Sequence, residues 1–242
     1  MGVVIEYKNV QKKYGEQAVV DNFSLVISKG EFVTIIGSSG SGKTTILKMV
    51  NGLILPDQGN VYVEGKDIAK EDLIVLRRNI GYAIQGSVLF PHMTIEKNIA
   101  YVPNLLNKGD KKRTKAAVRK WLEIVGLAED MLERFPDELS GGQQQRVGIA
   151  RALAASPDIL IMDEPFGAVD EITRVQLQDE ISRIHKQTGI TVMFVTHDIK
   201  EALKLGTKVL VMDQGEIQQF AKPEEIMEAP QTKFVGQLVH SR

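Results

Sequence analysis

The sequence predicts an α/β fold with a largely parallel core sheet, and two observations support this prediction. Short apolar runs rich in β-branched residues recur along the chain, as they do in buried strands. Helical patterns separate several of these runs, and strands that alternate with helices form a mainly parallel sheet. With 242 residues, 43% of them hydrophobic, the chain is long enough to bury a substantial core.

The strands expected from the apolar runs are of two kinds. The first ones are separated by the turn-like segments KKYGEQ and SKGE rather than by helices, which predicts an antiparallel edge or subsheet at the N-terminus. The later ones alternate with helical patterns, which predicts parallel strands. The expected strands cover residues 3–7, 23–27, 32–36, 61–63, 80–84, 159–162, 191–195, 209–212 and 216–220.

Helical patterns dominate the middle of the chain. From about residue 95 to residue 155 the sequence shows no strand pattern, whereas the runs 111–125 and 141–155 favour helix. A further helix is expected where Leu177, Ile181 and Ile184 share one face. The sequence therefore predicts a helical insertion in the α/β core.

Composition and charge exclude several classes of function. Thirty Lys and Arg against 31 Asp and Glu leave a net charge of -1, so no global field attracts nucleic acid or an anionic membrane. The absence of cysteine excludes disulfides, thiolate nucleophiles and iron–sulfur clusters. No apolar run approaches the roughly 20 residues that span a bilayer, and no signal peptide is expected. Any anion recognised by this chain must be bound locally.

The strongest local motif follows the expected strand 32–36. Residues 37–44 read GSSGSGKT and lead into the helix-like TILKMVNG, which is the strand-before, helix-after context of a phosphate-binding loop. Glycines let successive backbone N–H groups turn toward phosphate oxygens, Lys43 supplies a point charge, and Thr44 offers a hydroxyl to Mg²⁺. The alternative, a turn rich in Gly and Ser, does not account for the flanking strand and helix.

A second motif delivers two carboxylates to the end of a buried strand. Residues 159–164 read ILIMDE, and α/β sheets place their ligands at the carboxyl ends of such strands. Asp163 is expected to hold Mg²⁺, directly or through water, and Glu164 to polarise an attacking water. Alone, this pair would indicate only a strand end that meets solvent; beside a phosphate loop, the functional interpretation is favoured.

A third motif, LSGGQQQR at residues 139–146, precedes the helix-like VGIARALAAS. Ser140 and Gln143 have the spacing of a capping box, so a helix starts here with glycines that open its backbone toward an anion. By itself this pattern predicts no more than a capped helix.

These three motifs in this order resemble the nucleotide-binding subunit of ATP-binding-cassette (ABC) transporters, whose signature is LSGGQ. That string should arise by chance in about one chain in a few thousand. The resemblance covers the chain from the first strand to about Phe220. It implies a P-loop NTPase core with a mainly parallel sheet, an N-terminal antiparallel β subdomain and an inserted α-helical subdomain. The implied limits within the single ABC ATPase domain 1–242 are 1–94 and 157–220 for the RecA-like core with its antiparallel subdomain, 95–156 for the helical subdomain and 221–242 for a C-terminal helical tail.

The resemblance also implies ATP and Mg²⁺ as cofactors and assigns roles to residues. Tyr14 matches the aromatic that stacks on adenine, Gln85 the glutamine that contacts Mg²⁺ and the attacking water, and His197 the switch histidine at the γ-phosphate. Together with Lys43 and Glu164, Gln85 and His197 make up the implied catalytic set, and Mg²⁺ would be held by Thr44, Gln85 and Asp163. The implied ATP contacts are Tyr14, Val19, Ser38, Ser39, Gly40, Ser41, Gly42, Lys43, Thr44 and Thr45.

A second copy of the chain is implied as a partner. In the family, the signature turn contacts ATP bound to the opposite subunit, so two ATP molecules are buried in a symmetric homodimer. Asp170 matches the loop that crosses between subunits, although Gly167 stands where that loop usually has Ser and therefore lacks a hydroxyl. The signature contacts implied here are Ser140, Gly141, Gly142 and Gln143. The other histidines, His92, His185 and His240, are expected to be surface or packing residues.

Narrower similarities point to one kind of transporter. The segments YAIQG at 82–86, LFPHMT at 89–94 and FGAVD at 166–170 resemble the corresponding segments in the ATPase subunits of importers of glycine betaine, choline or carnitine. This implies integral-membrane permease subunits as partners, a substrate-binding protein acting indirectly, and a peripheral place on the cytoplasmic face of the membrane. Residues 89–99 are expected to form part of the groove for a permease helix. Importers for amino acids or polyamines share most of these segments and stay open as alternatives.

Two rival functions remain. A cassette ATPase of translation or DNA repair is disfavoured because the chain has one cassette, no long coiled-coil insertion and no basic stripe; the run 111–115 is expected to be a solvated helix start. A regulator that binds nucleotide without hydrolysing it is disfavoured by the presence of Glu164 and His197.

Overall fold

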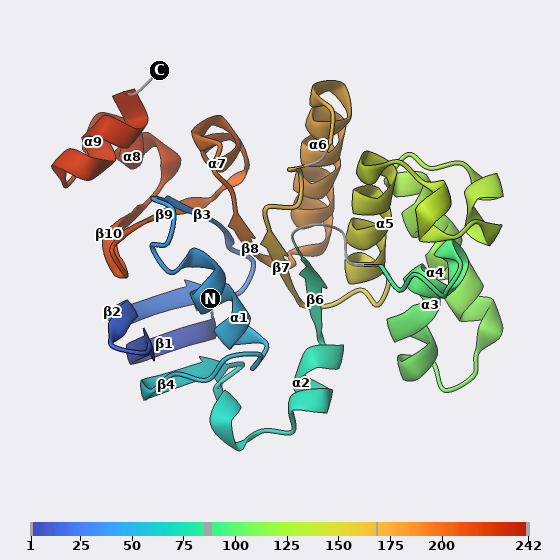
Figure 1. Cartoon of the computed structure of the whole chain (residues 1–242), viewed down its shortest axis with the longest axis horizontal. Helices are drawn as coiled ribbons and strands as arrows, with labels where there is room; N and C mark the ends of the chain where they lie inside the picture. The colour runs from blue at the N-terminus through green and yellow to red at the C-terminus, as the bar shows by residue number, and fades with distance from the viewer. Residues whose placement is uncertain (1, 85–88, 168, 241–242) are drawn as a thin grey trace. The chain divides into compact units, whose positions relative to one another are not determined.

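The structure, a computed structural model, describes residues 2–84, 89–167 and 169–240. By its internal contacts the chain divides into two compact units (Figure 1). Unit 1 comprises Met1–Arg77 and Thr188–Arg242, and unit 2 comprises Arg78–Gln187. The predicted subdomain limits at residues 94 and 156 stay predictions.

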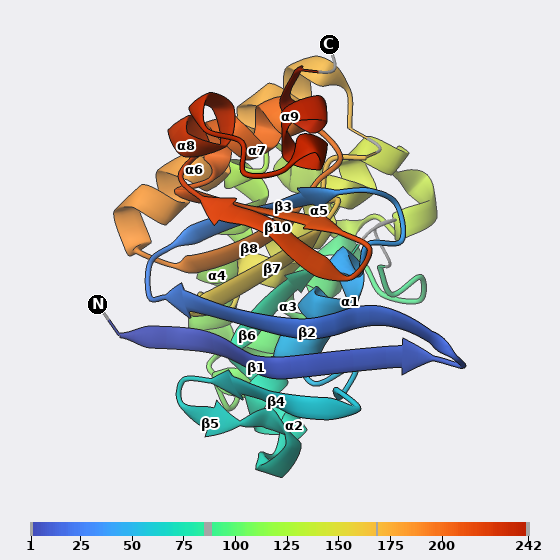
Figure 2. The ribbon, with the colours of Figure 1, turned by 90° about the vertical axis from the view of Figure 1, so that its left-hand side faces the viewer.

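Unit 1 begins with the antiparallel sheet predicted for the N-terminus, which is confirmed (Figure 2). The strands are longer than expected, because the turn between β1 and β2 takes only two residues, and Tyr14 already pairs with Gln17 across it. Gly15 turns the chain there at φ 62°, which a glycine adopts without strain. The sheet has the order β2-β1-β4-β5, with β1 at Val3–Tyr14, β2 at Gln17–Ser28, β4 at Gln58–Val63 and β5 at Lys66–Asp67.

The other strands of unit 1 form the mainly parallel arrangement that the sequence predicts. β3 pairs in parallel with both β8 and β9, and β9 turns back as a hairpin into antiparallel β10. The residues of β8 are all buried, as are those of β3 up to its last residue, because helices cover both faces of such a sheet. The strands run in the order β10-β9-β3-β8, with β3 at Phe32–Gly37, β8 at Thr191–Val195, β9 at Lys208–Asp213 and β10 at Glu216–Ala221.

Helices and a buried tyrosine hold the two sheets of unit 1 together. The Tyr7 hydroxyl of β1 donates to the carbonyl oxygen of Ile46 in α1 at 2.8 Å, and the Tyr7 ring meets Phe23 edge-on. At the C-terminus, Ile226 and Val235 are fully buried against Val211 of β9, so the expected helical tail is part of the core. The helical segments are α1 at Lys43–Val50, η1 at Ile68–Lys70, α2 at Leu73–Arg78, α7 at Ile199–Leu205, α8 at Pro223–Glu228 and α9 at Lys233–His240.

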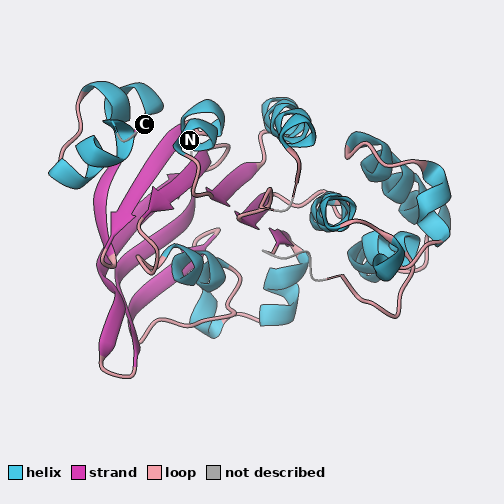
Figure 3. Cartoon of the chain, turned by 45° about the horizontal axis from the view of Figure 1, so that its top comes forward, coloured by secondary structure: helices cyan, strands magenta, loops and turns pink. Residues whose placement is uncertain are grey.

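Unit 2 is mostly helical (Figure 3). Residues 95–155, all of them described, contain helices and 3₁₀ turns and no strand, as predicted. α5 lies close to β6, since a Cβ at Gly81 would come 2.4 Å from the Ala152 carbonyl oxygen. β6 and β7 pair in parallel. The elements are β6 at Ile80–Ala83, α3 at Ile95–Leu106, α4 at Lys111–Ile124, η2 at Glu129–Glu133, η3 at Pro136–Glu138, α5 at Gly141–Leu153, β7 at Ile159–Asp163 and α6 at Glu171–Thr188.

The burial of side chains in unit 2 limits which residues of segment 89–99 are available to contact a permease helix. Leu89, Ile95 and Ile99 lie in the predicted permease groove but are buried in the core of the unit. Buried residues offer no surface to a partner, so the accessible part of segment 89–99 consists of exposed residues such as His92 and Lys97 and of half-buried ones such as Phe90 and Met93.

Candidate nucleotide-binding site

The phosphate loop of unit 1 follows β3 and is shaped by glycines. At Gly37 a Cβ would lie 1.8 Å from the Met212 carbonyl oxygen, and at Gly42, with φ 92°, it would lie 2.6 Å from the Val19 carbonyl oxygen. No side chain fits at either position without moving backbone, which leaves the loop's own backbone free to face a ligand. Val19, an expected ATP contact, is thereby placed beside the loop.

The Lys43 ammonium lies at the centre of this loop. Its Nζ donates to the carbonyl oxygens of Gly37 at 3.0 Å and Ser38 at 2.6 Å, and the residue is only 6% exposed. α1 starts at Lys43, and the N-cap residue before it, Gly42, provides no side-chain cap. The positive end of the helix dipole and a buried ammonium thus converge on one small cradle, which fits an anionic phosphate.

The loop is fastened to the end of β9 by one side-chain contact. The Ser38 hydroxyl donates to the Asp213 carboxylate at 2.5 Å. Because Gly37 pairs with Met212 in the sheet, Asp213 directly follows the backbone against which the loop is packed. Sequence reasoning missed Asp213; its one signal was an acid at the end of an apolar run.

His197 lies at the same sheet edge as the loop. Ile35 of β3 and Val195 of β8 are paired in parallel, so the residues that follow both strands emerge at their common carboxyl end. His197 is exposed there, directly before Asp198, whose carboxylate caps α7 by accepting from the Lys200 amide at 2.7 Å. Unit 1 therefore brings together three of the expected parts: the loop, Val19 and His197.

The remaining loop residues have distinct environments. Ser39 and Gly40 are exposed, Ser41 and Thr45 are buried, and Thr44 is half-buried. Tyr14 lies at the tip of the first hairpin with 51% of its surface exposed. An exposed ring is available for stacking, and the adenine contact of Tyr14 stays a prediction.

The two expected acids lie in unit 2 at the end of β7. Asp163 is 2% exposed, and Glu164 follows with φ 47°, a left-handed conformation that ends the strand abruptly. A non-glycine residue held at positive φ is strained, and such strain is concentrated at functional sites. The Gln145 side-chain amide donates to the Glu164 carbonyl oxygen at 3.4 Å, which links α5 to this turn.

The signature motif starts α5 as predicted. The Gln143 amide donates to Ser140 Oγ at 3.3 Å, and the Ser140 amide donates to Gln143 Oε1 at 2.9 Å, so the capping box is confirmed. Gly141 is exposed and Gly142 half-exposed at the start of the helix. Small, accessible residues at a helix N-terminus leave its backbone open to an anion.

Asp170 precedes α6 and caps its first turn. Its carboxylate accepts from the Thr173 amide at 3.0 Å. Hydrogen bonds from the Thr173 backbone and side chain, helped by the Arg146 charge, hold the pKa of Asp170 below its ordinary value. At Gly167 a Cβ would come no closer than 3.7 Å to the Glu164 carbonyl oxygen, so the serine usual in the family would fit there.

The side chains expected to bind Mg²⁺ carry the oxygen ligands that this ion prefers. Thr44 and Asp163 supply a hydroxyl and a carboxylate, and Mg²⁺ binds oxygen ligands and is commonly held by one or two carboxylates together with substrate phosphates and water. The third expected ligand, Gln85, lies outside the described residues.

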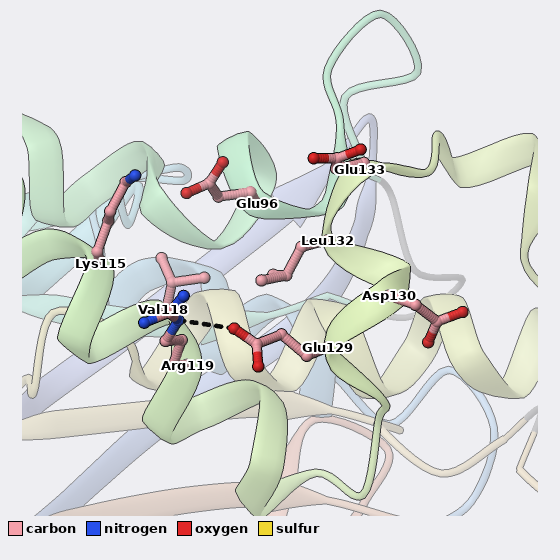
Figure 4. Close-up of a pocket in the computed structure, with 8 residues that line it drawn as sticks. All are labelled: Glu96, Lys115, Val118, Arg119, Glu129, Asp130, Leu132 and Glu133. Atoms are coloured by element: carbon pink, nitrogen blue, oxygen red, sulfur yellow. Dashed lines mark ion pairs between the residues drawn. The ribbon is translucent and has the colours of Figure 1, made fainter.

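A separate cavity of about 470 Å³ lies among α3, α4 and η2 of unit 2 (Figure 4). Its wall carries mostly charged side chains, including an ion pair of 2.8 Å between Arg119 and Glu129, with Val118 and Leu132 among them. None of the expected site residues lines it.

Known proteins resemble this chain in sequence over most of its length. The sequence model described as ABC transporter matches residues 20–167. A carnitine transport ATP-binding protein, OpuCA of Listeria monocytogenes, is 48% identical over 98% of this chain and 59% of its own length. The glycine betaine uptake system ATP-binding protein YehX of Escherichia coli is 46% identical over 97% of this chain and 76% of its own.

A solved structure agrees with the sequence relatives. The ATP-binding cassette MJ0796, in a dimeric post-hydrolysis state bound to ADP and Pi, matches with a TM-score of 0.85 and 34% identity over 90% of this chain and 98% of that one. This chain spans about three-fifths of the length of the OpuCA relatives. Among its described residues, no helix has the length and apolarity to cross a bilayer.

Proposed function

This chain belongs to the ABC transporter family, and from that premise we propose that it binds and hydrolyses ATP to energise an importer of quaternary amines such as glycine betaine, carnitine or choline. The observation that carries the ATPase part is the loop closed around the buried Lys43 ammonium at the sheet edge that also presents His197. The substrate class is supported by the relatives named for carnitine transport and glycine betaine uptake at 46–48% identity.

Binding of ATP starts from the contacts that Lys43 makes in the structure. Its ammonium exchanges the carbonyl oxygens of Gly37 and Ser38 for phosphate oxygens, while the first amides of α1 and the loop backbone surround the phosphates. Thr44 and Asp163 would hold Mg²⁺, which supplies charge neutralisation when bound.

Hydrolysis needs an oriented water and stabilisation of the γ-phosphate. Glu164 accepts a hydrogen bond from the attacking water and orients it, and His197 donates to a γ-phosphate oxygen. Gln85 completes this set in the proposal. Because the chemistry is mostly positioning, the strained turn at Glu164 is suited to hold one carboxylate direction.

A second copy completes each site in this proposal. The open backbone at Gly141 and Gly142, together with Ser140 and Gln143, contacts the ATP of the opposite subunit, and Asp170 lies on the loop that crosses between them. The dimeric state of MJ0796 supports this arrangement. Closure on ATP and reopening after hydrolysis would drive permease subunits, which places the chain at the cytoplasmic face of the membrane.

The test is uptake of labelled glycine betaine in source cells whose only copy of this subunit is wild type, Glu164→Gln or the control Glu216→Gln. Glu216 is an exposed acid in the β9–β10 hairpin, so its neutralisation controls for charge. Carnitine, choline, a polyamine and an unrelated amino acid serve as competitors. We expect loss of quaternary-amine uptake in Glu164→Gln alone. Retained betaine uptake, with purified Glu164→Gln devoid of ATPase activity, would disprove the substrate class and leave only the ATPase.

A further inference from the structure

The side chain of Tyr82 in β6 has an unusual environment. Its hydroxyl is buried, yet among the described residues it has no hydrogen-bond partner. Buried tyrosine hydroxyls nearly always find one, because a donor removed from water without a partner destabilises the fold. If packing alone determined this position, phenylalanine would fill it without that cost. Within the part of the chain that the structure describes, the hydroxyl is therefore left without a hydrogen bond that its burial favours.

The pairing of β6 with β7 shows where that partner would be. Tyr82 lies opposite Ile161 in the parallel register, and Asp163 follows two residues later on the same strand. Side chains alternate between the faces of a sheet, so Ile161 and Asp163 share a face with Tyr82. A tyrosine side chain is long enough to reach a diagonal neighbour. Both groups are in unit 2, and Asp163 is 2% exposed.

The electrostatics agree with this placement. Burial raises the pKa of Tyr82, and the negative charge of Asp163 raises it further. The effect of the Asp163 charge on Tyr82 agrees with the short separation that the strand register implies.

We propose that Tyr82 is a positioning residue whose hydroxyl donates to one oxygen of the Asp163 carboxylate while the other oxygen binds the divalent cation of the nucleotide. This inference rests on the proposed function. Carboxylates that bind a metal are commonly held by a hydrogen bond to their second oxygen, which fixes their direction and tunes their affinity. In the structure the Tyr82 hydroxyl does not make this hydrogen bond.

The experiment compares Tyr82→Phe with Tyr101→Phe in the full chain. Tyr101 lies on α3 of the same unit and is 41% exposed, so it is a matched control for the loss of one phenol hydroxyl. Three quantities are measured: the melting temperature without nucleotide, the affinity for ATP in EDTA, and the affinity of the ATP-loaded protein for Mn²⁺ as the probe cation.

For Tyr82→Phe we expect an equal or higher melting temperature, unchanged ATP affinity in EDTA, and Mn²⁺ affinity lowered about tenfold. Its ATPase activity should recover in excess Mg²⁺, since the reacting groups are intact. Tyr101→Phe should match the wild type in all measurements.

A lower melting temperature of Tyr82→Phe with unchanged Mn²⁺ affinity would overturn the inference, because the hydroxyl would then have a purely structural partner. Wild-type protein that binds no ATP with Mn²⁺ present would overturn the proposed function as well, so the two failures are distinguishable.

Discussion

The contact between Ser38 and Asp213 leads to a quantitative prediction. It joins the phosphate loop to the end of β9 through a hydroxyl and a carboxylate 2.5 Å apart. A hydrogen bond to a charged group contributes about 1.5–3 kcal/mol, and we expect the lower end because this pair is only partly buried. Removing it should therefore lower the free energy of unfolding by about 1.5 kcal/mol.

The assay is a double-mutant cycle of Ser38→Ala and Asp213→Ala, with urea unfolding followed in the absence of nucleotide. Once Asp213 is removed, Ser38→Ala should cost almost nothing more, which gives a coupling energy of about 1.5 kcal/mol. Asp213→Asn keeps an acceptor and should fall between wild type and Asp213→Ala. Glu216→Gln removes the same charge from the same hairpin and should change stability by less than about 0.5 kcal/mol. A coupling energy below about 0.3 kcal/mol would refute the reasoning.

Further predictions concern five other positions. Gly42→Ala should weaken ATP binding at least about tenfold in a fluorescent-nucleotide titration, because its Cβ meets backbone at 2.6 Å, whereas Gly40→Ala, with open space around it, should weaken it less. Gly167→Ser should leave the free energy of unfolding within about 0.5 kcal/mol of wild type; a larger loss would show that the loop rejects a side chain. Ser140→Ala should cost about 1 kcal/mol and lower the Tm by about 2–4 °C. The folded pKa of Asp170 lies below its ordinary 3.8, so its stabilising contribution is complete above pH 3.8 and is lost as the pH falls through the folded value. The Tm difference between wild type and Asp170→Asn should therefore disappear at acid pH, and a pH-independent difference would contradict this.

Local patterns predicted most of the elements. The strand 191–195 and the starts of α4 and α5 follow the sequence because apolar periodicity and caps are properties of neighbouring residues. The first hairpin was predicted too short, since polar residues on an exposed antiparallel sheet resemble a turn. Its strands run on to Tyr14 and start again at Gln17.

The candidate site was predicted where motifs carry chemistry and missed where contacts are remote in sequence. Ser38 and Asp213 are 175 positions apart, and no local pattern joins them. The role of Tyr82 depends on the register of two strands whose first residues are 79 positions apart, Ile80 opposite Ile159. Such pairs become visible only when the fold places them together.

The contact of Gln145 with the backbone of Glu164 links the start of α5 to the proposed catalytic turn. α5 carries the signature turn at its first residues and, one turn later, holds the carbonyl of the residue proposed to orient water. A rigid helix cannot shift its start without shifting Gln145. In the proposed dimer, a shift of the signature turn on contact with a second subunit would therefore be transmitted along α5 to the backbone of Glu164.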